Sequence, residues 1–152
     1  MGAWVTLAAT VVGAAIALAG QNAVRHGEAR MRFTDLLLEQ CVQLNALDED
    51  FRNRIWEEKE LGLSGRVELW DLRGHRIATA RLRVLCRDEH LLHALDEVVR
   101  TGKQLGRYWR RGQEDSAETE ELFELYTVAC AEFLAAAAVM IEKHLPSRSL
   151  VP

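Results

Sequence analysis

The sequence predicts an all-α protein with three parts: an N-terminal transmembrane helix over residues 1–24, an antiparallel four-helix bundle over residues 25–145, and a short tail over residues 146–152. Three observations lead to this prediction. Residues 2–24 contain no charged side chain. The remainder repeats apolar residues at the spacings of amphipathic helices. The only two prolines, Pro146 and Pro152, lie beyond the last predicted helix, so proline interrupts none of them.

The opening segment LAATVVGAAIALAG, residues 7–20, forms the centre of the predicted span. About 22 helical residues rising about 1.5 Å each reach about 33 Å, which matches the hydrocarbon core of a bilayer. Arg25, Arg30 and Arg32 follow the span, and by the positive-inside rule they hold its C-terminal side in the cytoplasm. Arginine outnumbers lysine 16 to 3, a bias typical of high-GC bacterial genomes. The sequence thus predicts a single-pass protein of a bacterial cell membrane with a cytoplasmic C-terminal domain.

Two other interpretations of this segment stay open. Ala17-Leu18-Ala19 resembles the small-residue cleavage site of a signal peptide. However, no lysine or arginine precedes the apolar run, where a secretory signal normally has one. Alanine occupies seven of residues 3–19, which lowers the hydropathy and is compatible with a soluble helix.

The predicted span carries a small residue at every fourth position, at Ala9, Gly13 and Ala17. In lipid, where hydrophobic attraction between helices is weak, such a ridge lets two backbones approach closely. The pattern predicts self-association through these three residues. Alanine-rich spans also show it by chance.

Residues 25–60 are expected to form one long helix. Its apolar stripe consists of Phe33, Leu37, Cys41, Leu44, Phe51 and Ile55. Asp48 is the one polar residue on that stripe. The two glycines of LGLSG, residues 61–65, end the helix.

Residues 66–85 fit two structures. Val67 and Leu69 on either side of Glu68 alternate as in a strand, with Gly74 available for a hairpin turn. In a helix, six residues of this segment would lie on one face: Val67, Trp70, Gly74, Ile77, Arg81 and Val84. The helix is the preferred prediction, because both flanking segments are helical.

The next predicted helix covers residues 89–101, with Asp88 as its N-cap. Its predicted inward residues are Leu91, Leu92, Leu95, Val98 and Val99. Gly102 and Gly106 are expected to loosen or end it, before it resumes to about Arg111.

The last predicted helix runs from about residue 117 to residue 145. Asp115 with Glu118 resembles a capping box at its start, and Pro146 stops it. Its inward stripe is Leu122, Tyr126, Ala129, Phe133, Ala137, Met140 and Ile141.

This layout, with stretches such as RLRVLCRDEHLLHALDEVV over residues 81–99, resembles small uncharacterised actinobacterial proteins that have one N-terminal span and a helical cytoplasmic bundle. The resemblance covers most of the chain. It implies this fold, and it implies no particular activity or functional residue.

Motifs for catalysis or cofactor binding are absent from the sequence, which contains no GxSxG motif and no glycine-rich phosphate loop. His90 and His93, one helical turn apart, are weak candidates for metal ligands, but a di-metal bundle would need a second such pair. We therefore expect no enzyme, cofactor or small-molecule substrate. The three cysteines are widely spaced and odd in number, which fits free thiols in a reducing compartment.

Charge is unevenly distributed along the chain. Residues 61–112 carry a net charge of +5, whereas residues 25–60 carry −3 and residues 113–152 carry −6. The most basic stretch offers a contact for anionic lipid or a protein partner through Lys103, Arg107, Tyr108, Trp109, Arg110 and Arg111. Pairing of these arginines with acidic residues elsewhere in the bundle is the simpler explanation. So few basic residues on an acidic protein argue against a nucleic-acid partner.

Together these features predict a membrane-anchored interaction or scaffold protein whose cytoplasmic bundle binds a protein partner or another copy of itself. One alternative is an oligomerising membrane effector of the toxin or defence type. A second alternative is a metal-binding or catalytic helical bundle.

Overall fold

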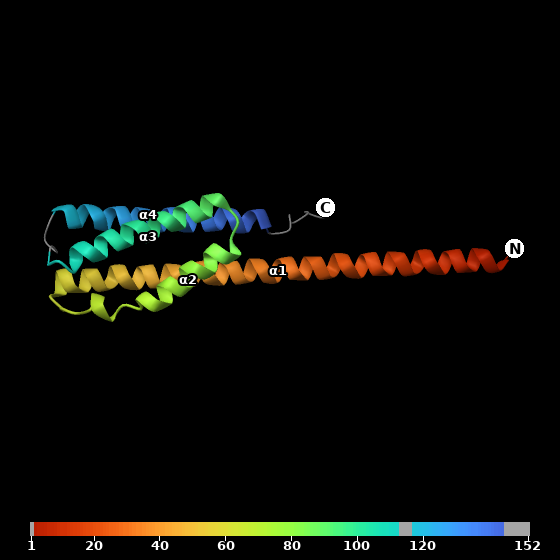
Figure 1. The fold of residues 1–152 in the computed structure, drawn as a ribbon, viewed down its shortest axis with the longest axis horizontal. Coiled ribbons are helices and arrows are strands. Elements are labelled where there is room, and N and C mark those ends of the chain that lie inside the picture. The colour runs from red at the N-terminus through yellow and green to blue at the C-terminus, as the bar shows by residue number, and fades with distance from the viewer. Residues whose placement is uncertain (1, 113–116, 145–152) are drawn as a thin grey trace, which may run out of the picture. The chain divides into compact units, whose positions relative to one another are not determined.

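The structure is a computed structural model that describes the backbone of residues 2–112 and 117–144 and the side chains of residues 27–112 and 117–143. Its elements, labelled in Figure 1, are the helices α1 (Gly2–Leu61), α2 (Leu72–Leu85), α3 (Glu89–Trp109) and α4 (Ala117–His144), with a short 3-10 helix η1 (Val67–Leu69). No strand occurs in these described ranges. The predicted all-α class is therefore confirmed, and the hairpin alternative for residues 66–85 is wrong.

The chain divides into two compact units, Met1–Asp35 and Leu36–Pro152, whereas the sequence placed the boundary of the anchor at residue 24. The first unit is helical from Gly2 onward. Its described side chains from Gly27 to Phe33 are all exposed. The ridge at Ala9, Gly13 and Ala17, and the predicted span as a whole, lie outside the side chains that the structure describes.

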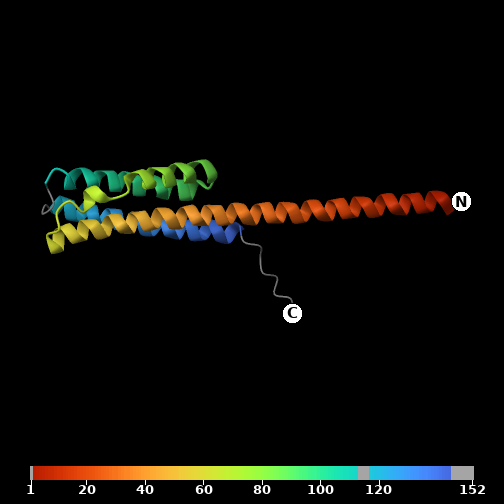
Figure 2. The same cartoon turned by 90° about the horizontal axis from the view of Figure 1, so that it is seen from below.

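The second unit is an antiparallel four-helix bundle built from residues 36–61 of α1 together with α2, α3 and α4. Successive helices run in opposite directions, as the colour gradient of Figure 1 shows. In Figure 2, α4 lies beside α1 in one layer and α3 lies with α2 in the other. Each helix therefore packs against its neighbours in the chain, and α4 closes the bundle against α1.

The core of the bundle follows the predicted stripes closely. Leu37, Cys41, Leu44, Phe51 and Ile55 of α1 are all buried. From α4 the core receives Tyr126, Ala129, Phe133, Ala137 and Met140. From α3 it receives Leu91, Leu95, Val98, Leu105 and Trp109. Phe33, the first member of the predicted α1 stripe, is exposed and lies in the other unit.

The inward face of α2 differs from the predicted one. The helix begins only at Leu72, where the Asp71 carboxylate accepts a hydrogen bond from the Gly74 backbone N–H at 2.8 Å. This N-cap places Gly74 in the first turn of the helix. The buried residues of α2 are His75, Ala78, Thr79 and Leu82, whereas Ile77 and Val84 are 41% and 80% exposed. The extended backbone at Trp70 separates η1 from α2, so residues 67–84 never share one helical register.

The helix α3 runs without interruption through both of its internal glycines. Asp88 caps it as predicted, accepting from the Leu91 backbone N–H at 3.0 Å. Gly102 lies against the Tyr126 ring, where a Cβ atom would stand 2.9 Å from Cε2. This glycine does not end the helix; it allows α3 and α4 to approach each other.

Among the described residues, one segment is long and apolar enough to cross a membrane, namely Ala117–Lys143 in α4, which contains an 18-residue window with a mean hydropathy of 1.6. The core helix of a bundle satisfies the same criteria. Because α4 packs its Tyr126 and Phe133 side chains into the bundle core, its length and hydropathy alone do not make it a span.

Candidate functional site

A buried polar cluster joins three helices at the centre of the bundle. The Tyr126 hydroxyl on α4 donates a hydrogen bond to Asp48 Oδ1 on α1 at 2.6 Å. His75 Nε2 on α2 lies 3.1 Å from the same oxygen. Asp48 is the polar residue that interrupts the predicted apolar stripe, and the cluster accounts for its place there.

The Asp48 side chain is only 1% exposed, and its second oxygen, Oδ2, has no hydrogen-bond partner among the described residues. Burial, together with the nearby Asp48 carboxylate, raises the pKa of Tyr126 well above its usual range. The tyrosine therefore keeps its proton and remains a donor to Asp48. The Asp48 carboxylate holds the His75 ring in place. Without His75 and Tyr126, this carboxylate would be buried without a hydrogen-bond partner, which is energetically costly.

Aromatic rings surround this cluster. The Phe51 ring stacks at a tilt on Trp70, with centroids 4.5 Å apart, and meets Tyr126 edge-on at 5.6 Å. The Trp70 indole N–H donates to the Leu47 carbonyl at 2.8 Å, and its ring lies 5.1 Å from that of His75. These contacts hold Trp70 in one orientation, although it lies between η1 and α2 and not within a helix.

A pocket of about 640 Å³ opens beside the cluster. Its lining comes from η1, from all four helices and from the turn before α2, and lies wholly within the second unit. His75, Thr79 and Tyr126 form the polar part of its inner wall. Its apolar lining includes Phe51, Val67, Trp70, Leu72, Val98 and Val99.

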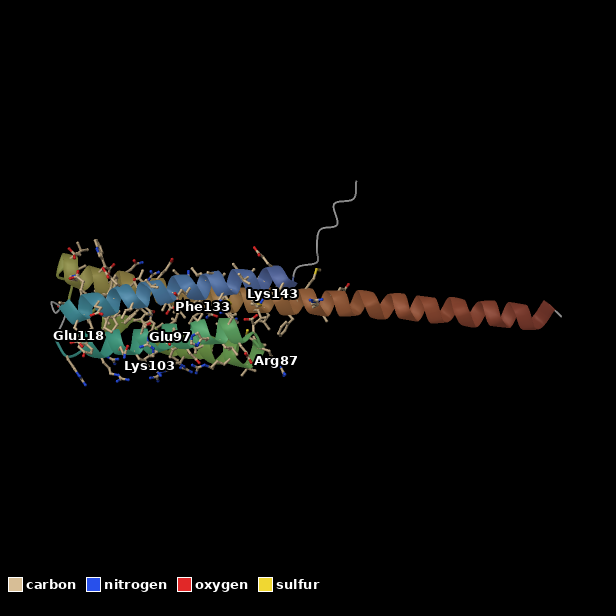
Figure 3. The ribbon with its side chains drawn as sticks, turned by 90° about the horizontal axis from the view of Figure 1, so that it is seen from above. Arg87, Glu97, Lys103, Glu118, Phe133 and Lys143 are labelled. Atoms are coloured by element: carbon tan, nitrogen blue, oxygen red, sulfur yellow. The ribbon has the colours of Figure 1, made fainter. Side chains whose placement is uncertain are left out.

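Basic side chains dominate the exposed edge of the pocket. Four cations line it: Arg76 and Arg83 of α2, Lys103 of α3, and Arg110, the C-cap of α3. Glu68 is the one acidic lining residue. The cations are spaced by seven residues on each helix, which places each pair on one helical face. Figure 3 shows Lys103 on the outer side of α3. The edge therefore carries an excess of positive charge.

The residues of the predicted basic contact lie in different surroundings in the structure. Lys103 and Arg110 line the pocket, whereas Arg107 and Arg111 are exposed elsewhere on the surface. Tyr108 is half-buried and donates to the Glu118 carboxylate. Two of the six residues therefore line the pocket, and two are exposed outside its lining.

For Trp109 the prediction of an exposed contact is wrong, because this residue belongs to the core. It is 4% exposed, and its indole N–H donates to Glu58 Oε2 at 2.6 Å. A side chain buried in this way is not available to lipid or to a partner. The physical reason is helical phase, because position 109 follows Leu105 by one turn on the buried face.

The candidate metal ligands His90 and His93 are both exposed on α3. Within residues 27–112 and 117–143, no three or more histidine, cysteine, aspartate or glutamate side chains gather in a way that could hold a metal ion. The three cysteines, Cys41, Cys86 and Cys130, are free thiols buried in the bundle core.

The pocket and the polar cluster were not predicted from the sequence. One signal for them was present, namely Asp48 on an apolar stripe, since a carboxylate there requires a buried partner. His75 carried no comparable signal, because its inward position depends on where α2 begins. In comparisons with protein-family models, curated proteins and solved structures, the chain has no significant match.

Proposed function

We propose that this protein is a single-pass membrane protein whose cytoplasmic bundle serves as a scaffold for a protein partner or for a second copy of itself. The observation that carries the proposal is the position of the core. Among the described residues, the buried apolar cluster begins at Leu37, and Leu36–Pro152 form one compact unit, whereas the uncharged residues 2–24 belong to the other. A helical segment of that length and composition can serve as an anchor.

The basic residues that follow the uncharged segment support the orientation. Arg25, Arg30 and Arg32 would remain on the cytoplasmic side, together with the bundle that follows them. The helix α1 extends from Gly2 to Leu61, so it contains both the proposed anchor and the first helix of the bundle.

Exposed apolar side chains support the interaction role. Soluble proteins rarely gather many of them without a partner. On α4 the exposed residues include Leu125, Val128, Leu134 and Val139. On residues 36–61 of α1 they include Leu36, Leu38, Val42 and Trp56. Contact with a partner protein would remove these side chains from water.

Alkaline extraction of membranes tests the anchor with the full-length chain. We expect the protein to stay in the membrane pellet, and replacement of Ala14 and Ile16 by arginine to release it, since charged residues at the centre of a span are costly. The matched control is Val128→Arg with Val139→Arg, which adds the same charge to exposed positions of the bundle. Release of the unaltered protein, or a mature N-terminus at Gly20, would contradict the proposal.

Labelling with a membrane-impermeant maleimide tests the orientation. The native thiols are buried, so an introduced cysteine gives the main signal. In intact spheroplasts we expect Gly2→Cys to react and Val84→Cys, at an 80% exposed position, to react only after lysis. Labelling of the Val84→Cys protein in intact cells would place the bundle outside.

An oligomerising membrane effector is the second candidate, and the apolar composition of α4 is the observation that favours it. Such a protein would release α4 from the bundle and insert it into the bilayer. Expression of the full-length chain distinguishes the two functions. A scaffold leaves the membrane potential unchanged, whereas an effector dissipates it, and replacement of exposed Val128 and Val139 by arginine should then abolish the dissipation.

A further inference from the structure

We propose that the pocket beside Asp48, His75 and Tyr126 binds a small amphiphilic anion, with one carboxylate or phosphate head and a short apolar body. This inference does not depend on the scaffold role, and only its test in nanodiscs uses the proposed anchor. It assigns the bundle a ligand-binding role that is absent from the sequence-based predictions.

The size and lining of the pocket suit the apolar body. A volume of about 640 Å³ lies within the range of small-molecule sites in proteins. Phe51 and Trp70 supply aromatic surface, and Val98 and Val99 supply aliphatic surface from α3. The ring contact between Phe51 and Trp70 and the indole hydrogen bond to Leu47 hold this wall in place before any ligand enters.

The charge of the pocket edge suits the anionic head. Arg83 is already paired with Asp96 at 2.6 Å, and the Nε atom of Arg110 donates to the Gly106 carbonyl at 2.8 Å. Neither Arg76 nor Lys103 forms an ion pair within the described part of the chain. These two cations project from facing helices, and an anion between them would be attracted by both.

An unpartnered buried hydroxyl is an independent indication of a ligand. Thr79 lines the pocket, is 6% exposed, and its Oγ1 has no hydrogen-bond partner among the described residues. A buried hydroxyl without a partner is costly, and a polar atom of a ligand would satisfy it. Thr79 lies one turn after His75 on the buried face of α2, so both can contact the same molecule.

Binding can be measured with the full-length protein in phosphatidylcholine nanodiscs, labelled with fluorotryptophan. Fluorine NMR then reports on Trp70 inside the pocket, and Trp70→Phe identifies its signal. The probes are octyl phosphate and octanoate, with octanol as the uncharged analogue and inorganic phosphate as the head alone. We expect both anions to shift the Trp70 signal to saturation, with octanol and phosphate binding about tenfold or more weakly.

Two exposed cations on α3, one helical turn apart, provide a matched pair of variants. Lys103→Glu reverses a charge at the pocket edge, and Arg107→Glu makes the same change in net charge outside the lining. We expect Lys103→Glu to weaken octyl phosphate binding about fivefold and Arg107→Glu to leave it nearly unchanged. Thr79→Val should weaken binding of the anions and leave octanol binding unaffected.

The anion can come from solution or from a lipid of the same membrane, and nanodiscs containing phosphatidylglycerol separate these sources. If a lipid head occupies the pocket, octyl phosphate will bind more weakly in these discs than in phosphatidylcholine discs. If the ligand is soluble, its affinity will be the same in both. The proposal is overturned if octanol binds as tightly as octyl phosphate, or if Lys103→Glu and Arg107→Glu have equal effects.

Discussion

Tyr126 and Asp48 stand 78 positions apart in the sequence, and the tyrosine hydroxyl donates to the buried carboxylate at 2.6 Å. This hydrogen bond joins the last helix of the bundle to the first. Because Asp48 Oδ1 also lies 3.1 Å from His75 Nε2 of α2, side chains of three helices meet at one oxygen atom.

Removing the Tyr126 hydroxyl tests this relationship. We expect Tyr126→Phe to lower the free energy of unfolding by about 1–3 kcal/mol, because the buried Asp48 carboxylate loses its closest donor. Urea unfolding followed by circular dichroism measures the change. The control is Tyr108→Phe, which removes a hydroxyl bonded to the exposed Glu118 and should cost clearly less. Equal losses in the two variants would mean that the Asp48 contact contributes no special stability.

Two glycines of α3 give opposite expectations for the same substitution. Gly102→Ala should destabilise the bundle by about 1–3 kcal/mol, because its Cβ would stand 2.9 Å from Tyr126 Cε2. A Cβ atom at Gly106 would lie 3.5 and 3.6 Å from its nearest neighbours, which is an ordinary contact distance. Gly106→Ala should therefore stabilise the helix by up to about 1 kcal/mol. Thermal unfolding of both variants checks the signs. A stabilised Gly102→Ala protein would show that α3 and α4 do not need this close approach.

Buried thiols make the bundle sensitive to alkaline pH. Burial raises the pKa of Cys41 from 9.0 to about 11, and that of Cys130 from 9.0 to about 12. Below pH 9 the thiols are neutral in both the folded and the unfolded state, and their burial contributes fully to the free energy of unfolding. At higher pH the unfolded thiols ionise first, the unfolded state binds fewer protons, and the free energy of unfolding falls until the folded thiols ionise as well.

Melting temperatures from about pH 8 to about pH 11 should therefore decline, and less steeply after Cys41→Ala with Cys130→Ala. A thiol reagent such as dithionitrobenzoate should react slowly with the native protein and rapidly after unfolding, since the thiolate is the reactive form. Rapid reaction of the native chain would contradict the burial of these cysteines.

Self-association through the proposed anchor can be tested at the ridge of Ala9, Gly13 and Ala17. Gly13→Ile should weaken association in a membrane two-hybrid assay, because a bulky side chain prevents close backbone approach without reducing hydropathy. Val12→Ile, one position away from the ridge, is the control and should have little effect. If neither change alters association, the contact between copies belongs to the bundle and residues 2–24 act as an anchor alone.

The sequence by itself determined the helices and most of the buried residues of this protein. Apolar spacing predicted the core faces of α1, α3 and α4, including Leu44, Leu95 and Phe133, all of them buried. Asp88 was recognisable as an N-cap. These features are readable because helix periodicity and capping depend on residues only a few positions apart.

Only the tertiary structure decided which face of α2 turns inward, and why Gly102 and Trp109 occupy their positions. It also brought Asp48, His75 and Tyr126 together and formed the pocket beside them. None of these relationships has a local pattern, because each joins elements far apart in the chain. Their geometry depends on the few residues that begin α2 and on the distance between α3 and α4, which emerge only when the helices pack.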